Sequence, residues 1–259
     1  MLQPCYRFLL TTLLYALAGI AMAMDVKVEF SAEAVQMAPQ RPTMHSTMYV
    51  SKKAVRTESS YNNQQMVEIV FPRDGRRLML IPQQRAYMEQ TGLPVAPIVN
   101  SQQKNFSPCT GIPYAECKKL GVENLQGRQA QKWEITVQRE GQKLSSTHWI
   151  DAKRNMPLRE IFPDGTRSEL TLLKNEKMNG RKTEKWQVTM TRPDGQSMQS
   201  SQWYDPQLQM MIREELPGGY VRELRNIKVG KQSAKLFEIP NGYQRMMAPP
   251  ATPANLQVR

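Results

Sequence analysis

The segment Gly127-Arg-Gln-Ala-Gln-Lys-Trp133 returns 53 residues later as Gly180-Arg-Lys-Thr-Glu-Lys-Trp186. Two further pairs of segments keep this correspondence at an offset of 54: Trp149-Ile150-Asp151 with Trp203-Tyr204-Asp205, and Leu158-Arg159-Glu160 with Ile212-Arg213-Glu214. The offset grows by one because the turn inside the second copy is one residue longer. The chain therefore contains an internal repeat, with copies over about 123–176 and 177–230.

Within each copy, apolar and polar residues alternate as they do in half-buried β-strands. The residues expected to share a face are Trp133, Ile135 and Val137 in one copy and Trp186, Val188 and Met190 in the other. Each copy is predicted to form a four-stranded antiparallel meander, and two such units form a broad sheet. A broad sheet with one apolar face curls, closes or is covered, because exposed apolar surface of that size is a liability or a binding site. The predicted fold is mainly β (α+β): a broad antiparallel sheet with few short helices.

Short β-like runs also fill the N-terminal half. The segment 25–30 alternates charged residues with Val26, Val28 and Phe30, and the runs that follow are 43–50, 54–59, 66–71, 76–81 and 84–90. Arg73-Asp74-Gly75 between two of these runs is typical of a hairpin turn. These runs extend the predicted sheet toward the N-terminus.

Less regular segments punctuate the chain. Residues 91–107 have no clear period and predict a long connection, which leads to a helical turn or two over 114–120. The segment 236–243 is expected to add a last short strand and turn. The Pro- and Ala-rich residues 246–259 predict a disordered tail, so that one domain spans 24–245.

The first 23 residues have the pattern of a cleaved export signal. An apolar run from Phe8 ends in Ala21-Met22-Ala23, the small-x-small pattern of a signal-peptidase site, which predicts cleavage between Ala23 and Met24. The run is shorter than the roughly 20 residues of a membrane-spanning helix, so a retained anchor is the weaker alternative. Cys5 leaves with the signal, and the mature chain is expected in the periplasm.

Two cysteines remain after cleavage, Cys109 and Cys117, with seven residues between them. An even pair in an exported chain predicts a disulfide. A redox or metal pair is the alternative, but reactive dithiols favour Cys-x-x-Cys spacing.

The charge of the chain is +12, and removal of residues 1–23 leaves +11. Basic surface attracts anionic partners through salt-screened fields, so an anionic membrane surface or an envelope protein is a plausible partner. An exported address and few aromatic residues argue against nucleic acid.

The sequence shows no recognisable catalytic or metal motif. The two histidines, His45 and His148, lie in different predicted strands, and the Gly-x-Ser-x-Gly, His-Glu-x-x-His, Walker A and Gly-x-Gly-x-x-Gly patterns are absent. We expect no enzyme activity, cofactor or metal centre. The 17 methionines leave copper binding through thioethers as an alternative, although flexible apolar lining or plain core explains them as well.

Several segments together resemble the periplasmic LolA-like superfamily of lipoprotein carriers, lipoprotein receptors and lipid-sensing domains. They are Met48-Tyr49-Val50-Ser51-Lys52-Lys53, Val55-Arg56-Thr57-Glu58, Leu78-Met79-Leu80-Ile81-Pro82, Tyr87-Met88, Pro157-Leu158-Arg159-Glu160 after Trp-x-Asp, and Phe237-Glu238-Ile239-Pro240-Asn241-Gly242-Tyr243. The resemblance implies a strongly curved antiparallel sheet or half-barrel, whose concave apolar face holds acyl chains under a lid of short helices. The chain departs from it in the lid, for which residues 91–120 would have to serve.

The function expected from these observations is non-catalytic binding of a lipid, or of the acyl part of a lipoprotein, in an apolar concavity. An interaction module of an envelope assembly or stress-sensing pathway is the alternative, and periplasmic copper binding is a second one. The candidate cavity residues are Trp133, Ile135, Trp149, Leu158, Trp186, Val188, Met190, Trp203, Met210 and Ile212.

Overall fold

The computed structural model describes residues 27–93, 107–109, 114–139, 141–154 and 156–246. Within this part of the chain, nearly all regular structure is β, in one mostly antiparallel sheet of 16 strands. The described helices are two short 3₁₀-helices, η1 (Pro82–Gln84) and η2 (Ala234–Phe237). The predicted signal peptide, its cleavage site and the tail beyond Met246 lie outside the described residues.

The strands form two meanders. The N-terminal meander contains β1 (Phe30–Met37), β2 (Met44–Val50), β3 (Val55–Tyr61), β4 (Gln64–Phe71), β5 (Arg76–Ile81) and β6 (Ala86–Gln90). The second contains β7 (Ala115–Leu125), β8 (Arg128–Arg139), β9 (Gln142–Asp151), β10 (Pro157–Ile161), β11 (Arg167–Met178), β12 (Arg181–Thr191), β13 (Ser197–Asp205), β14 (Met210–Leu216) and β15 (Tyr220–Val229). A short strand, β16 (Gln244–Arg245), closes the order.

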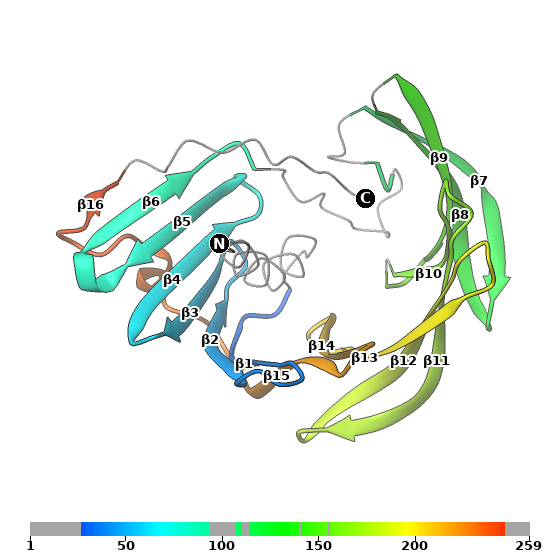
Figure 1. Ribbon diagram of the computed structural model, residues 1–259. Coiled ribbons are helices and arrows are strands. Elements are labelled where there is room, and N and C mark those ends of the chain that lie inside the picture. The colour runs from blue at the N-terminus through cyan, green and yellow to red at the C-terminus, as the bar shows by residue number, and fades with distance from the viewer. Residues whose placement is uncertain (1–26, 94–106, 110–113, 140, 155, 247–259) are drawn as a thin grey trace, which may run out of the picture.

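The two meanders are joined by a single ladder. Strands β1 and β15 pair antiparallel in the middle of the sheet, while β7 lies at one edge and β16 lies parallel to β6 at the other. The whole sheet bends into an open arch, with β1 and β15 near its middle (Figure 1). The predicted strongly curved antiparallel sheet is therefore confirmed.

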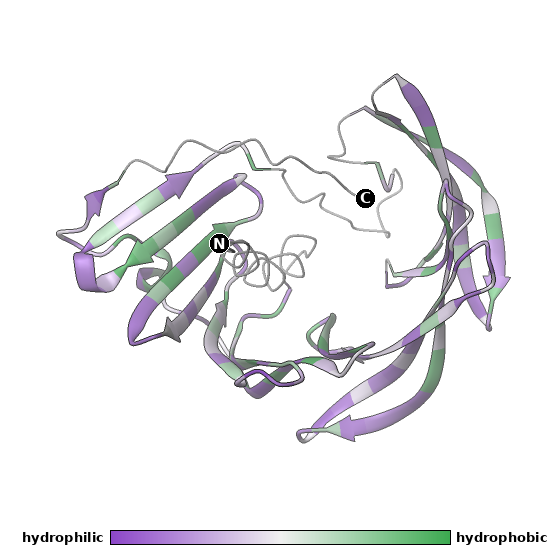
Figure 2. Ribbon diagram, in the orientation of Figure 1, coloured by the Kyte–Doolittle hydropathy of each residue, from purple (hydrophilic) through white to green (hydrophobic). Residues whose placement is uncertain are grey.

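Local sequence explains the regular hairpins. Hydrophobic and hydrophilic residues alternate along the strands, as Figure 2 shows. Two equivalent hairpins turn at Gln126-Gly127 and Asn179-Gly180, where both residues of each pair have positive φ. Such two-residue turns match the right-handed twist of the strands that they connect, and Gly and Asn tolerate the conformation.

The hydrophobic core is divided along the arch. Buried residues of β1, β2 and β3 pack with Trp203, Leu208 and Ile212 where the meanders meet. Residues of β4 and β5 form a second cluster, which Phe237 of η2 covers. The core therefore consists of separate clusters of buried residues that follow one another along the sheet.

Three sequence-based predictions of local structure were wrong. The segment 114–120 lies in β7 and not in a helix, because its backbone pairs with β8 from Ala115 to Leu125. The strand placed at 25–30 begins only at Phe30. Residues 236–243 do not form a strand; η2 ends at Phe237 and the loop after it packs on β3, β4 and β5. In each case tertiary packing outweighed the local pattern.

Candidate functional site

Direct pairing between strands assigns residues to the two faces of the sheet, because residues opposite each other project to the same side. One row of direct pairs crosses six strands, from β8 to β13: Trp133, His148, Glu160, Ser168, Met190 and Met198. We call this side of the sheet the first face. A second row on the same face runs from β12 through β15 to β2: Trp186, Gln202, Glu214, Arg222, Gln36 and Met44.

The candidate cavity residues do not share one face. Those on the first face are Trp133, Ile135, Trp186, Val188 and Met190. Trp149 and Trp203 project to the opposite face, since they pair directly with Lys132 and Lys185, the chain neighbours of the first-face tryptophans. Leu158 and Ile212 lie at β-bulges, and Met210 packs beside the cluster that contains Trp203.

Most of these side chains are deeply buried. All four tryptophans are 6% exposed or less, and Trp186 is fully buried. Ile135, Leu158 and Ile212 are buried too, whereas Met190 is 38% exposed and Val188 and Met210 are half-buried. The structure therefore leaves Met190, Val188 and Met210 as the candidates that a bound molecule could touch directly.

Trp149 and Trp203 have the same surroundings in the two copies. Each indole N–H donates to a glutamate 2.6 Å away, Glu123 in one copy and Glu176 in the other. A lysine and an arginine cover each ring: Lys132 and Arg159 at 4.9 and 5.6 Å from Trp149, and Lys185 and Arg213 at 4.6 and 5.4 Å from Trp203. These contacts satisfy the polar atom and shield the ring, so they are structural.

The aspartates that follow these tryptophans fix the next turn. Asp151 accepts hydrogen bonds from the backbone N–H groups of Lys153 and Arg154, and Asp205 accepts them from Gln207 and Leu208. Each carboxylate also pairs with an arginine, Arg128 or Arg181. The Trp-x-Asp motif is therefore a device that ends one strand and directs the chain into the next.

Partly exposed apolar side chains gather on the first face at the ends of β12 and β13. Met190 and Met198 are directly paired, and they are 38% and 48% exposed. Val188 lies two residues from Met190 on the same face and is half-buried. We call Val188, Met190 and Met198 the methionine surface. Its flexible thioether chains suit apolar ligands of varied shape.

A shallow apolar pocket lies on the same sheet, where the β1–β2 and β14–β15 hairpins end. We call it the hairpin pocket, and its lining residues are Gln36, Met37, Ala38, Arg41, Pro42, Met44, Leu216, Tyr220, Val221 and Arg222. Several of them belong to the second row of the first face. Sequence reasoning missed this pocket because it forms between segments almost 180 residues apart.

A partly buried carboxylate, Glu214, lies beside Arg222 of the pocket lining. Glu214 accepts a hydrogen bond from Gln202 and lies 3.7 Å from the Arg222 guanidinium. Burial raises the pKa of Glu214, and Arg222 opposes that shift. The Arg222 charge is therefore only loosely engaged by its neighbour.

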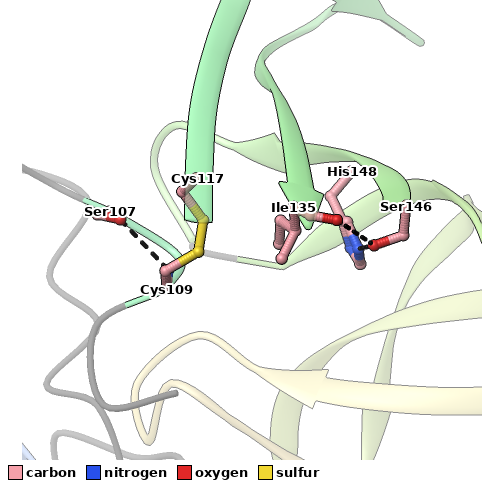
Figure 3. Close-up of a disulfide and its surroundings, with 6 residues drawn as sticks. All are labelled: Ser107, Cys109, Cys117, Ile135, Ser146 and His148. Carbon is pink, nitrogen blue, oxygen red and sulfur yellow. Dashed lines mark hydrogen bonds between the residues drawn. A yellow bond between two sulfur atoms is a disulfide. The ribbon is translucent and has the colours of Figure 1, made fainter. Parts of the chain in front are cut away.

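One polar row on the first face has the contacts of a nucleophile and its base. Ser146 Oγ lies 2.8 Å from His148 Nε2, and His148 Nδ1 lies 2.9 Å from Glu160 Oε1. Ser146 Oγ also lies 3.3 Å from the carbonyl oxygen of Ile135, which competes for the hydroxyl proton (Figure 3). A carbonyl oxygen beside the hydroxyl would repel a developing oxyanion, which acyl transfer requires donors to stabilise. The row is better explained as cross-strand hydrogen bonding.

The expected disulfide is present and covers one end of the first face. Cys109 is bonded to Cys117 on β7 (Figure 3). Both cysteines pack beside Trp133, Ile135 and Ile150. Cys117 is directly paired with Ile135. The disulfide thus packs against the edge of the sheet nearest to Trp133.

The described residues contain neither a membrane-spanning helix nor a metal-binding cluster. No helix there is long and apolar enough to cross a membrane. No group of three or more His, Cys, Asp or Glu side chains there is arranged to hold a metal ion.

The chain is similar to several solved structures at low sequence identity. No family model and no curated protein matches the chain. Among solved structures, the fold matches a LolA superfamily protein from Nitrosomonas europaea at 11% identity, covering 86% of this chain and 97% of that one, with a TM-score of 0.37.

Two further solved structures are similar to this chain. A domain assigned to outer membrane lipoprotein sorting, from Vibrio parahaemolyticus, is 10% identical and covers 87% of this chain and 95% of its own, with a TM-score of 0.35. MucB is 15% identical and covers 83% and 91%, with a TM-score of 0.22. Because all three TM-scores are below 0.5, the proposals below rest on the residues of this chain.

Proposed function

We propose that this chain is a non-catalytic periplasmic binding protein that holds a lipid, or the acyl part of a lipoprotein, on the first face of its sheet. The observation that carries the proposal is the methionine surface. Met190 and Met198 lie side by side and partly exposed on this face. The hairpin pocket opens on the same sheet and extends the apolar area.

The deeply buried tryptophans support the site without contacting the ligand. Trp186 lies in the same strand and on the same face as Met190, and its indole N–H donates to Glu184. It fixes the strand that presents the methionines. Binding would then depend on the exposed end of β12 rather than on the repeat motif itself.

The test is native mass spectrometry of the chain from Met24 onward, purified from the periplasm, followed by lipid extraction. Bound phospholipid or acylated peptide at near one per chain is the expected result. A ligand-free mass that persists after incubation with lipid would contradict the proposal.

Matched variants locate the site. Met190→Lys with Met198→Lys places two charges on the methionine surface and is expected to abolish lipid capture. Thr189→Lys with Gln199→Lys places the same charges on the opposite face, because Thr189 and Gln199 are the neighbouring direct pair. Equal loss of lipid in both double variants would argue against this surface.

An interaction module remains the second candidate, and the β7 edge favours it. Leu120 and Val122 are 45% and 56% exposed, and β7 pairs only with β8 among the described strands. An exposed strand edge can add a strand from a partner. Pull-down of an envelope protein that Val122→Lys prevents, from a chain that carries no lipid, would favour this function.

Copper binding is the third candidate. The adjacent thioethers of Met190 and Met198 are its best location in the described chain. Thermal stabilisation by Cu(I) that Met198→Leu abolishes would support it.

A further inference from the structure

The hairpin pocket has rigid walls. The turn at Gly218 and Gly219 has positive φ at both residues. A Cβ at Gly219 would lie 3.1 Å from Pro39 Cγ, so the β14–β15 turn presses closely on the segment that leaves β1. The backbone N–H of Arg41 donates to the Ala38 carbonyl, which tightens that segment. The two hairpin ends therefore pack closely together beside the pocket.

The interior of the pocket is apolar. Side chains from both meanders supply its surface: Met37, Pro42, Met44, Leu216, Tyr220 and Val221. Tyr220 is 42% exposed at its mouth. Removing such surface from water is favourable by roughly 25 cal/mol per Å².

The rim of the pocket is cationic. Arg41 is exposed and makes no ion pair with any described residue, while Arg222 is 3.7 Å from its partner Glu214. Other arginines on the sheet, such as Arg213 beside Glu223, are held at 2.9 Å. Arginine suits carboxylate and phosphate groups because its planar guanidinium donates two parallel hydrogen bonds.

From this juxtaposition we propose that the hairpin pocket binds the charged end of an anionic amphiphile. The carboxylate or phosphate is held by Arg41 and Arg222, and the first part of the apolar chain lies against Met44 and Leu216. The inference rests on the proposed function and deepens it, because it gives the ligand a negative charge and a direction on the first face.

The test is a calorimetric titration of the full mature chain, after removal of bound lipid, with four probes below their micelle concentrations. The probes are octyl phosphate, octanoate, octanol and inorganic phosphate. We expect at least one of the two charged amphiphiles to bind about tenfold or more tightly than octanol, and inorganic phosphate to bind more weakly than octyl phosphate. The ratio between octyl phosphate and octanoate then distinguishes a phospholipid headgroup from a free fatty acid.

Two variants test the residues in opposite directions. Arg41→Ala is expected to weaken binding of the better charged probe about tenfold, while Arg167→Ala, which removes an exposed arginine from β11, leaves it unchanged. Glu214→Gln frees Arg222 from its partner and is expected to strengthen binding several-fold.

The outcomes separate the two proposals. Equal affinity for octanol and both charged amphiphiles, or equal effects of Arg41→Ala and Arg167→Ala, would overturn the inference about the pocket. If Met190→Lys with Met198→Lys still abolishes acyl binding in that case, the proposed function survives. If no amphiphile binds, both fail.

Discussion

The two copies of the repeat are alike on one face of the sheet and different on the other. On the second face, Trp149 and Trp203 each donate to a glutamate and lie under a lysine and an arginine. On the first face, each indole donates to the residue two positions earlier, but that residue is the charged Glu184 for the fully buried Trp186 and the neutral Gln131 for Trp133, which is 6% exposed. The contacts that the two copies share thus lie on the second face, which the proposed ligand does not contact.

Position in the arch explains the difference. The strand of Trp186 has β11 and β13 on its two sides, followed by further strands, while the strand of Trp133 is one strand from the edge. At this edge, Cys109 and Cys117 pack against the cluster that contains Trp133. The copy over 177–230, the central copy, is therefore supported by strands on both sides. The copy over 123–176, the marginal copy, lies near the edge of the sheet and is supported there by a disulfide.

The largest expected effect is at the central tryptophan. Trp186→Ala should lower the free energy of unfolding by about 3 to 5 kcal/mol, because it leaves a cavity in a fully packed site. Trp133→Ala should cost less, since its surroundings can relax at the edge. Urea denaturation of both variants measures the difference, and a larger loss for Trp133 would reverse the comparison.

The aspartates should behave alike in the two copies. Asp205→Ala and Asp151→Ala each leave an arginine without its partner and two turn N–H groups without an acceptor. A loss of about 3 kcal/mol is expected in each variant. Denaturation midpoints of the two variants would show whether the equivalent contacts in the two copies contribute equally to stability.

The disulfide should matter only to the marginal copy. Cys109→Ser with Cys117→Ser is expected to cost about 2 kcal/mol, because the closed loop is short. Hydrogen exchange should accelerate in β7 and β8 and remain unchanged in β12. Uniform acceleration across the sheet would show that the loop supports more than the edge.

A smaller effect concerns the glutamates on the second face. Hydrogen bonds from Lys132 and from Trp149 lower the pKa of Glu123, and those from Lys174 and Trp203 lower that of Glu176. Trp149→Phe removes one donor and should raise the pKa of Glu123 toward its ordinary value without moving that of Glu176. Carboxyl chemical shifts followed with pH would detect this, and Trp203→Phe should give the reciprocal result.

The smallest effect is on the pH dependence of stability. Burial raises the pKa of Glu214, so the folded chain keeps a proton over a range of pH in which the unfolded chain has lost it. Stability therefore falls as pH rises from the ordinary glutamate pKa to the raised one. Glu214→Gln should remove that slope, which melting temperatures across the range would reveal.

The sequence predicted the architecture better than the site. Alternation, which is local, and the repeat predicted a broad antiparallel sheet, and the resemblance to LolA-like proteins supplied its strong curvature. Periodicity also grouped Trp186 with Val188 and Met190 correctly. It could not show that Trp203 faces away from them, since that depends on the register between strands, which places Trp203 opposite Lys185.

The remaining errors have the same origin. The segment 114–120 looked helical between Pro113 and Gly121, yet Gly121 lies at a β-bulge and the chain pairs with β8. The hairpin pocket combines Arg41 with Arg222, which no local pattern connects. Its available signals were the Gly218-Gly219 turn and the methionines on either side of Arg41, and neither indicates which distant strands meet.

The single ladder between β1 and β15 also determines the order in which the strands can pair during folding. Its partners, such as Ala34 and Leu224, are separated by most of the chain, whereas every other antiparallel pair joins consecutive strands. As the polypeptide emerges N-terminus first, local hairpins can form at once, but β1 must wait for β15 with one edge unpaired. Slow, non-local pairing of this kind leaves an aggregation-prone edge exposed. The arch, and with it the hairpin pocket, can therefore be completed only after the chain has emerged as far as β15.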